Sequence, residues 1–332
     1  MDITEVIASL EQFDAIIDVR TPDEWHSDHL PGAINAPVLS NEERIEIGTL
    51  YKQSPFEAKK RGAALVARNI AHALEFQFSE KPRNWKPLIY CWRGGNRSNA
   101  MGIVMQRIGW KATVLTGGYT AYRRYVITDL DRRAVQFQFK VICGVTGSGK
   151  SLFLRQRHTA GDQVLDLEAL AHHRGSLLGS EPCGEQPSQK YFETLLWNAL
   201  RHLDPNREVL VESESKKIGA LQVPQVLMDR MRESECIELI VGDDERVRYL
   251  CQDYAHFFSE PQRLKTQLDR LKPLIGKELL DAWHGLIDAT KWSELVSSLL
   301  LHHYDPTYRR SMQKNYSRYA KAQRISGHPA QK

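Results

Sequence analysis

The chain has 332 residues, of which 42% are hydrophobic and 26% charged, and its formal net charge is +4 at pH 7. This length suits two ordinary hydrophobic cores better than one large core. No uninterrupted apolar run approaches the ~20 residues that cross a bilayer, and the first residues lack the basic-then-apolar layout of a signal peptide. We therefore expect a soluble, cytoplasmic protein, in which any nucleic-acid partner must be inferred from where the charges lie.

The cysteine pattern argues against two kinds of site. The five cysteines are an odd number at irregular spacing, and no CxxC pair occurs. This pattern indicates reduced thiols and speaks against a disulfide framework or a zinc site, so we predict no metal centre built from them. The cysteines are Cys91, Cys143, Cys183, Cys236 and Cys251.

The first third of the chain alternates short apolar runs with helical patterns. Thr21 is the expected N-cap of a helix, with Pro22 in its first position and Glu24 completing a capping box. A turn and a short strand are expected within residues 29–37. The other expected strands are residues 15–20, 88–90 and 112–115. Short strands separated by helices predict a parallel α/β sheet.

The stretch of residues 88–98 carries the strongest chemical signal. Its strand delivers Cys91 into a loop that precedes a helix, for which Gly109 is the expected end. The positive end of the helix dipole, together with Arg93 and Arg97, favours the nucleophilic thiolate. Backbone N–H groups of this loop can curl around an anion, with Arg97 closing the ring. The anion-binding residues are Gly94, Gly95 and Asn96. A buried structural cysteine would need neither the glycines nor the arginines.

Several motifs of this region together resemble a rhodanese domain, over roughly residues 4–127. The resemblance rests on residues 18–20, 24–25, 29–35, the Cys91 loop and residues 117–119. The loop departs from the usual sulfurtransferase pattern, because the C-x5-R spacing from Cys91 to Arg97 is one residue longer. It is similar in length to the loops of rhodanese-like phosphatases and arsenate reductases, which leaves room for a phosphate-sized anion. An inserted basic segment, residues 45–74, could be a solvated helix pair or a tRNA contact.

A second anion-binding loop follows a charged connector at residues 128–136. Residues 137–143 are an expected strand, and residues 144–151 form a complete G-x-x-x-x-G-K-S phosphate loop before a helix. Its backbone N–H groups and the helix N-terminus bind phosphate oxygens, Lys150 neutralises them, and Ser151 can hold Mg²⁺. The predicted phosphate-binding residues are Gly144, Gly147, Ser148, Gly149, Lys150 and Ser151.

The second acidic residue of a nucleotide hydrolase is ambiguous. Asp166 and Glu212 each end an expected strand, but neither follows a clean hydrophobic run with a paired acid. No pattern that reads adenine or guanine stands out. The loop could therefore hold a diphosphate that is not part of a nucleotide, and the need for Mg²⁺ stays open.

The rest of the chain is mostly helical and ends in a basic segment. We expect helices at residues 188–203, from residue 243, and through 260–304, with a strand at 236–241. No acidic residue follows Asp305. The predicted tRNA phosphate contacts in this segment are Arg309, Arg310 and Lys314. Three tyrosines and a methionine fall on one helical face and are expected to pack on the protein body, while the basic residues point outward. This aromatic stripe comprises Tyr308, Met312, Tyr316 and Tyr319.

A rhodanese-like domain (residues 1–127) joined to a phosphate-loop domain (residues 137–332) resembles the tRNA 2-selenouridine synthase family. Further matches are residues 166–168, 172–176, 212–219 and 304–306. The resemblance implies a cytoplasmic transferase for which tRNA with 2-thiouridine at the wobble position is the partner. Geranyl diphosphate would alkylate the sulfur, and selenophosphate would then supply selenium through an S–Se intermediate on Cys91. Nothing in the residues themselves distinguishes selenium from sulfur.

Two other classes of function stay open. One is a rhodanese-like phosphatase or sulfurtransferase fused to an NTP-hydrolysing domain, with which the C-x5-R loop is compatible. The other is an RNA-binding adaptor with a decayed site, against which the intact Cys91, Lys150 and Ser151 count. The sequence favours a monomer but identifies neither the tRNAs bound nor the placement of the two sites.

Overall fold

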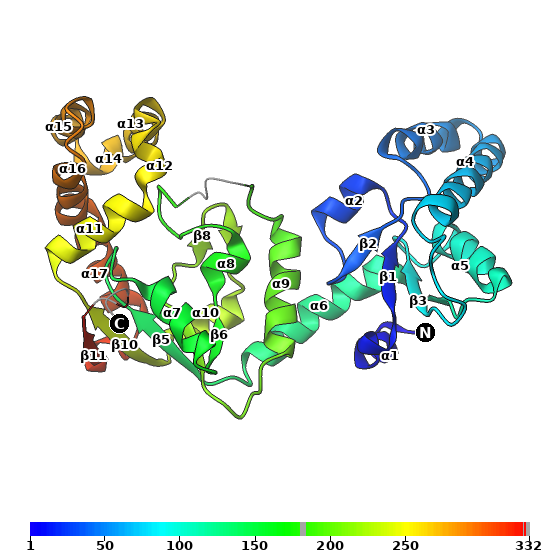
Figure 1. Ribbon diagram of the computed structural model, residues 1–332, viewed down its shortest axis with the longest axis horizontal. Coiled ribbons are helices and arrows are strands. Elements are labelled where there is room, and N and C mark those ends of the chain that lie inside the picture. Colours follow the sequence, from blue (N-terminus) through cyan, green and yellow to red (C-terminus); the bar gives the residue numbers. More distant parts are fainter. Residues whose placement is uncertain (180–183, 328, 330–332) are drawn as a thin grey trace. The chain divides into compact units, whose positions relative to one another are not determined.

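The protein, described here from a computed structural model, folds into two compact units. The structure describes residues 1–179, 184–327 and 329, so Cys183 lies outside the described residues. One unit comprises Met1–Leu130 and Pro187–Asn198, and the other Asp131–Gln186 and Ala199–Lys332. Each unit is built on its own parallel sheet (Figure 1). The α/β class expected from the sequence is therefore confirmed.

The sheet of the first unit has the order β2-β1-β3-β4, and every pair of neighbouring strands is parallel. Ile17 on the central strand lies opposite Ile34 on one side and Ile89 on the other. The strands are β1 (Ala15–Asp18), β2 (Ala33–Asn35), β3 (Pro87–Tyr90) and β4 (Thr113–Val114). All four expected strands are present, and each is as short as the sequence indicated.

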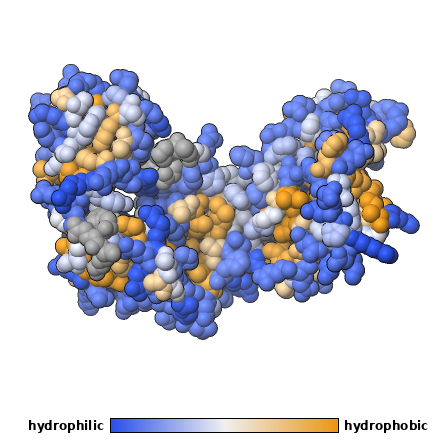
Figure 2. Space-filling model, viewed as in Figure 1, coloured by the Kyte–Doolittle hydropathy of each residue, from blue (hydrophilic) through white to orange (hydrophobic). Residues whose placement is uncertain are grey.

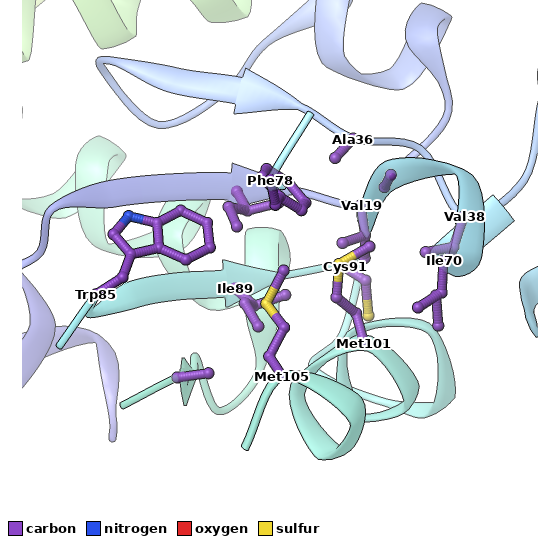
Figure 3. Close-up of a cluster of buried hydrophobic side chains, with 13 residues drawn as sticks. Val19, Ala36, Val38, Ile70, Phe78, Trp85, Ile89, Cys91, Met101 and Met105 are labelled. Atoms are coloured by element: carbon purple, nitrogen blue, oxygen red, sulfur yellow. The ribbon is translucent and has the colours of Figure 1, made fainter. Parts of the chain in front are cut away.

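Helices flank this sheet and close its core. The capping box predicted at Thr21 and Glu24 begins α2, and Gly109 ends α5 in the left-handed conformation. The helices of this unit are α1 (Ile3–Ala8), α2 (Pro22–Ser27), α3 (Asn41–Gln53), α4 (Pro55–Phe76), α5 (Asn96–Ile108), α6 (Gly118–Ala134) as far as Leu130, and α9 (Gln189–Arg201) as far as Asn198. Figure 3 shows Cys91 within the buried cluster, near Val19 and Met101. The reactive loop is thus anchored directly on the core.

The sheet of the second unit has the order β11-β10-β5-β7-β6, again entirely parallel. Its strands are β5 (Phe139–Cys143), β6 (Gln163–Leu165), β7 (Val209–Glu212), β10 (Glu235–Ile240) and β11 (Gln323–Ser326), and a separate hairpin joins β8 (Lys217–Ile218) to β9 (Leu221–Gln222). The helices beside the sheet are α7 (Lys150–Thr159), α8 (Leu167–Ala171) and α10 (Gln225–Arg232).

A helical region completes the second unit between β10 and β11. It has its own apolar core, in which Trp283 is fully buried among leucines. Its helices are α11 (Asp243–Asp253), α12 (Ala255–Phe258), α13 (Pro261–Leu268), α14 (Lys272–Ile275), α15 (Lys277–Asp288), α16 (Trp292–Leu299) and α17 (Asp305–Asn315). The structure thus confirms the helical C-terminal extension. In Figure 2 the visible surface is mainly hydrophilic, with separate apolar patches on each unit.

Two local expectations differ from the structure. Most of the expected connector at residues 128–136 lies within α6, because Leu130 and Ala134 keep a buried face despite the surrounding charges. The C-terminal aromatic stripe is not one helix: α17 ends at Asn315, Tyr316 adopts an extended conformation, and β11 then pairs with β10 at the sheet edge. Met312 and Tyr316 are buried, as expected for residues that pack on the body.

Candidate active site: two anion-binding loops

The first candidate site is the loop between β3 and α5. Cys91 directly follows β3, at the carboxyl end of a parallel strand, where such sheets hold their ligands. Gly94 has a φ of +64°, and a side chain there would collide with the backbone oxygen of Leu115. Glycine is therefore required for the loop to close on its neighbours. Gly95 is the N-cap of α5 and Asn96 its first residue, so the predicted anion-binding residues do lie at the helix mouth.

The surroundings of Cys91 favour its thiolate form. Burial, which leaves the residue only 3% exposed, raises the pKa, but hydrogen bonds to the sulfur outweigh that effect. The Ser98 hydroxyl donates to Sγ at 3.2 Å. The amides of Ser98, Arg93 and Gly95 add further donors, and the net result is a lowered Cys91 pKa. This is the state that a nucleophilic cysteine requires.

The two arginines of the loop have different surroundings. Arg97 is partly buried, and its Nη1 donates to Glu24 Oε2 at 2.8 Å. Although burial opposes the shift, this ion pair lowers the pKa of Glu24. The side chain of Arg93 is exposed. Arg97 therefore ties the loop to α2, while Arg93 stands where an incoming anion could meet it.

The buried ion pair between Arg20 and Asp18 lies beside aromatic residues that border the Cys91 loop. Arg20 is 1% exposed, and its guanidinium donates to both carboxylate oxygens of Asp18. Its guanidinium lies 4.0 Å from the centroid of the Tyr119 ring. Because a planar guanidinium both pairs with the carboxylate and stacks on the ring, Arg20 fixes β1 against residues that border the Cys91 loop.

The second candidate site is the phosphate loop between β5 and α7. Lys150 Nζ donates to the backbone oxygen of Gly144 at 2.9 Å, so the lysine lies across the loop. The Ser148 hydroxyl is buried and has no hydrogen-bond partner among the described residues. Gly147 and Gly149 have φ angles of +81° and +77°, which a side chain rarely adopts. The motif predicted from the sequence is thus folded as a cradle for phosphate oxygens.

Carboxylates gather beside the phosphate loop. The hydroxyl of Ser151 donates to Glu168 at 2.6 Å. Glu212 is fully buried at the end of β7 and accepts the amide of Glu168 at 2.7 Å. Burial first, and then repulsion by Asp166 and Glu168, raise the pKa of Glu212 well above its usual value. Glu212 is therefore placed to hold Glu168 in position.

The structure shows which acidic side chain contacts the phosphate loop. Asp166 accepts the amide of Ala169 at 2.8 Å and acts as the N-cap of α8. Glu168, two residues further on, contacts Ser151 instead. A serine hydroxyl and a carboxylate are oxygen ligands of the kind Mg²⁺ takes. Among the described residues, no three His, Cys, Asp or Glu side chains cluster as a metal site of their own.

The helical region also reaches the phosphate loop. Tyr308 on α17 accepts the Gly144 amide at 2.7 Å and lies 2.9 Å from the Ser213 hydroxyl. Arg246 on α11 donates to the Thr146 oxygen at 2.9 Å and forms a bidentate ion pair with Asp305. The loop borders a cavity of about 350 Å³ within this unit.

Comparisons with known proteins agree with this two-part architecture. A family model described as the tRNA 2-selenouridine synthase AAA domain matches residues 137–326, and a rhodanese-like domain matches residues 2–125. A tRNA 2-selenouridine synthase from Alcanivorax borkumensis is 32% identical, with 88% of each chain covered. One from Cupriavidus necator is 34% identical, covering 89% of this chain and 87% of the relative. This chain belongs to the tRNA 2-selenouridine synthase family.

A solved structure is similar in sequence to part of this chain. The N-terminal domain of a protein described as ATP/GTP binding, from Clostridium difficile 630, is 35% identical with a TM-score of 0.34. It covers 38% of this chain and 98% of that chain.

Sequence reasoning missed several residues of this synthase-family site. The sequence could have indicated Ser98 as a hydrogen-bond donor to Cys91. This serine directly follows Arg97 and lies in the first turn of α5, the helix that begins beside the sulfur. Tyr308 and Arg246 carried no such signal, since they approach the phosphate loop from 164 and 100 residues away. The predicted tRNA contacts Arg309, Arg310 and Lys314 are exposed on α17. Among the described residues, no helix is long and apolar enough to cross a membrane.

Proposed function

We propose that this protein converts 2-thiouridine at the wobble position of tRNA into 2-selenouridine. The observation that carries the proposal is the buried Cys91 sulfur, ringed by four hydrogen-bond donors that lower its pKa beside a helix mouth. A thiolate beside an anion-binding loop suits a residue that takes selenium from selenophosphate. The relatives' names supply the RNA substrate.

In the first proposed step, geranyl diphosphate alkylates the RNA. The 2-thio sulfur attacks the first carbon of the geranyl group, the C–O bond breaks, and diphosphate leaves with the bonding electrons. The phosphate loop supports this step, because Lys150 and the loop amides can hold the diphosphate and stabilise the charge it gains. Mg²⁺ held by Ser151 and Glu168 would add further positive charge there.

In the second proposed step, selenium takes the place of the alkylated sulfur. Alkylation turns a poor leaving group at C2 of the uridine into a good one, so selenium bonds to C2 and the geranylthio group departs. Before that, the Cys91 thiolate attacks the selenium of selenophosphate: the S–Se bond forms, the Se–P bond breaks, and its electron pair stays on phosphorus, which leaves as phosphite beside Arg93 and the loop amides. After selenium has bonded to C2, a low-molecular-weight thiol reduces the S–Se bond, which releases 2-selenouridine and restores the Cys91 thiol. We expect the protein to act in the cytoplasm, where tRNA is modified.

The test is mass spectrometry of wobble nucleosides from cells with and without this protein. 2-Selenouridine should be present only with the protein, and 2-thiouridine should remain in its place without it. Identical nucleosides in both samples would contradict the proposal.

A nucleotide-hydrolysing role is the second candidate. The observation that favours it is the Ser151–Glu168 pair, a hydroxyl and a carboxylate placed as Mg²⁺ ligands beside Lys150. Turnover of ATP or GTP by the purified protein, lost in Lys150→Ala, would support this alternative. Absence of turnover alongside geranyl transfer would support the diphosphate donor.

A further inference from the structure

An apolar groove lies beside the Cys91 loop within the first unit. Its volume is about 760 Å³, and it runs between α3, α4 and α5. Most of its wall is hydrocarbon, contributed by Leu39, Ile47, Val66, Leu74, Ala100 and Val104. Asn96 and Arg97, the last residues of the anion-binding loop, also line it. The groove therefore adjoins the helix end of the anion-binding loop, although Cys91 itself does not line it.

Small side chains on α4 keep the groove open. Ala63, Ala67 and Ala71 are spaced four residues apart, so they fall on one face of the helix, and all three line the groove and remain exposed. Below them, Ile70 is 4% exposed and belongs to the core of the unit. The groove thus has a rigid apolar floor and a wall from which bulky side chains are missing.

Polar contacts fix the relative position of the helices that form the groove. Asn69 on α4 donates to the Val38 oxygen at 3.1 Å and to Glu43 of α3 at 2.7 Å. Arg68 donates to the same Glu43 at 2.7 Å. Because α4 is tied at this point both to α3 and to the chain before it, the groove exists before any ligand arrives.

The charge distribution selects the chemistry of the occupant. Lys59 and Arg97 are the only charged residues that line the groove within the described part of the chain, and Arg97 is paired with Glu24. A polar chain along the apolar wall would give up its hydrogen bonds to water without gaining new ones. A hydrocarbon chain has no such hydrogen bonds to give up, and its burial is favourable. Grooves with mostly apolar walls and a few polar groups at one end are typical ligand sites.

We propose that this groove holds the geranyl chain of S-geranyl-2-thiouridine RNA during selenium transfer. The inference rests on the proposed function and adds the binding place of the geranyl chain. With the chain between α4 and α5, the attached sulfur and C2 of the uridine lie at the Asn96–Arg97 end, where the groove adjoins the Cys91 loop. The groove thereby recognises alkylated RNA and rejects RNA that still carries the free 2-thio group, which has no chain to bury.

The test fills the groove with a bulky side chain. In Ala67→Trp the indole would occupy the space between α4 and α5, and Ala63→Trp provides a second, independent block. Ala64→Trp is the matched control, because Ala64 is an exposed alanine on the same helix that does not line the groove. Each full-length variant is given selenophosphate, a low-molecular-weight thiol and RNA carrying either S-geranyl- or S-methyl-2-thiouridine.

Wild type and Ala64→Trp should bind S-geranyl RNA at least ~10-fold more tightly than S-methyl RNA, since the longer chain buries more apolar surface. Ala67→Trp and Ala63→Trp should lose that preference and still bind S-methyl RNA normally, which shows that they fold. Equal affinity of wild type for both RNAs, or an undiminished preference in both groove variants, would overturn the inference. If the preference follows this pattern but no 2-selenouridine forms, the groove assignment stands and the proposed function fails.

Discussion

The hydroxyl of Ser98 lies 3.2 Å from the sulfur of Cys91 and donates a hydrogen bond to it. Both residues are buried, and the serine is on the first turn of the helix that follows the loop. The strand thus supplies the nucleophile and the helix supplies both its dipole and a direct donor. This arrangement stabilises the thiolate through hydrogen bonds and the helix dipole.

The first prediction concerns that hydrogen bond. Ser98→Ala should raise the Cys91 pKa, because the thiolate loses a donor while its burial is unchanged. A hydrogen bond worth ~1 kcal/mol corresponds to roughly a fivefold loss of thiolate at neutral pH. The measurement is the pH dependence of Cys91 alkylation by iodoacetamide, with the exposed neighbour changed in Asn99→Ala as the control. An unchanged alkylation profile in Ser98→Ala would show that the serine does not stabilise the thiolate.

The second prediction separates the two loops. Lys150→Ala should lower geranyl transfer by ~10²-fold or more, since a preorganised positive charge is removed from the diphosphate. Selenium transfer to RNA that is already geranylated should fall much less. Both steps are followed by mass spectrometry of the RNA, and Lys277→Ala, an exposed lysine on α15, is the control. Equal losses in both steps would contradict separate roles for the two loops.

The third prediction concerns Glu214, whose pKa is raised from 4.5 to about 8 by burial and by repulsion from Glu168, although Lys150 opposes the shift. The folded state therefore holds a proton that the unfolded state releases. Stability from this group is complete below pH ~4.5 and is lost as the pH rises toward 8. Urea denaturation at several pH values should show that Glu214→Gln, which cannot ionise, gains stability relative to wild type as the pH rises. A difference that does not change with pH would contradict the raised pKa.

The fourth prediction concerns the basic residues of α17. Replacing Arg309, Arg310 and Lys314 with alanine should weaken tRNA binding and flatten its salt dependence by up to about one unit per lost phosphate contact. Single-turnover rates at saturating tRNA should stay close to wild type, because the contacts expected of these residues are to the RNA backbone and not to the reacting base.

The matched control replaces three exposed basic residues of the first unit, Arg83, Arg107 and Lys111, with alanine. A salt titration of tRNA binding distinguishes the two triple variants. Parallel slopes and equal affinity for the α17 variant and wild type would show that this helix face is merely solvated.

How much the sequence predicted depends on how local each signal was. The Cys91 loop and the phosphate loop are continuous stretches bounded by a strand and a helix, so their glycines and charges could be interpreted directly. Asp166 and Glu212 looked equivalent because both end a strand. Only the fold shows that Asp166 caps α8 and that Glu168 is the residue at Ser151.

Other features depended on distant parts of the chain. β11 pairs with β10, and the paired residues Glu238 and Arg324 are 86 positions apart in the chain. No local pattern in the basic C-terminal segment predicts this strand. The groove beside Cys91 requires α3 and α4 of the inserted segment to stand against α5. The sequence left a solvated helix pair as one of two interpretations of this segment, and it could not indicate an apolar space beside the reactive loop.

The measurement that tests the central claim most directly is selenium transfer by Cys91→Ser. The purified variant and wild type are each given 2-thiouridine RNA, geranyl diphosphate, selenophosphate and a low-molecular-weight thiol, and the nucleosides are resolved by mass spectrometry. A serine hydroxyl is far less ionised than the loop-activated thiol. We predict that the variant accumulates S-geranyl-2-thiouridine and forms no 2-selenouridine, because the phosphate loop is intact and the selenium acceptor is gone. Formation of 2-selenouridine by Cys91→Ser at near wild-type rate would contradict the account.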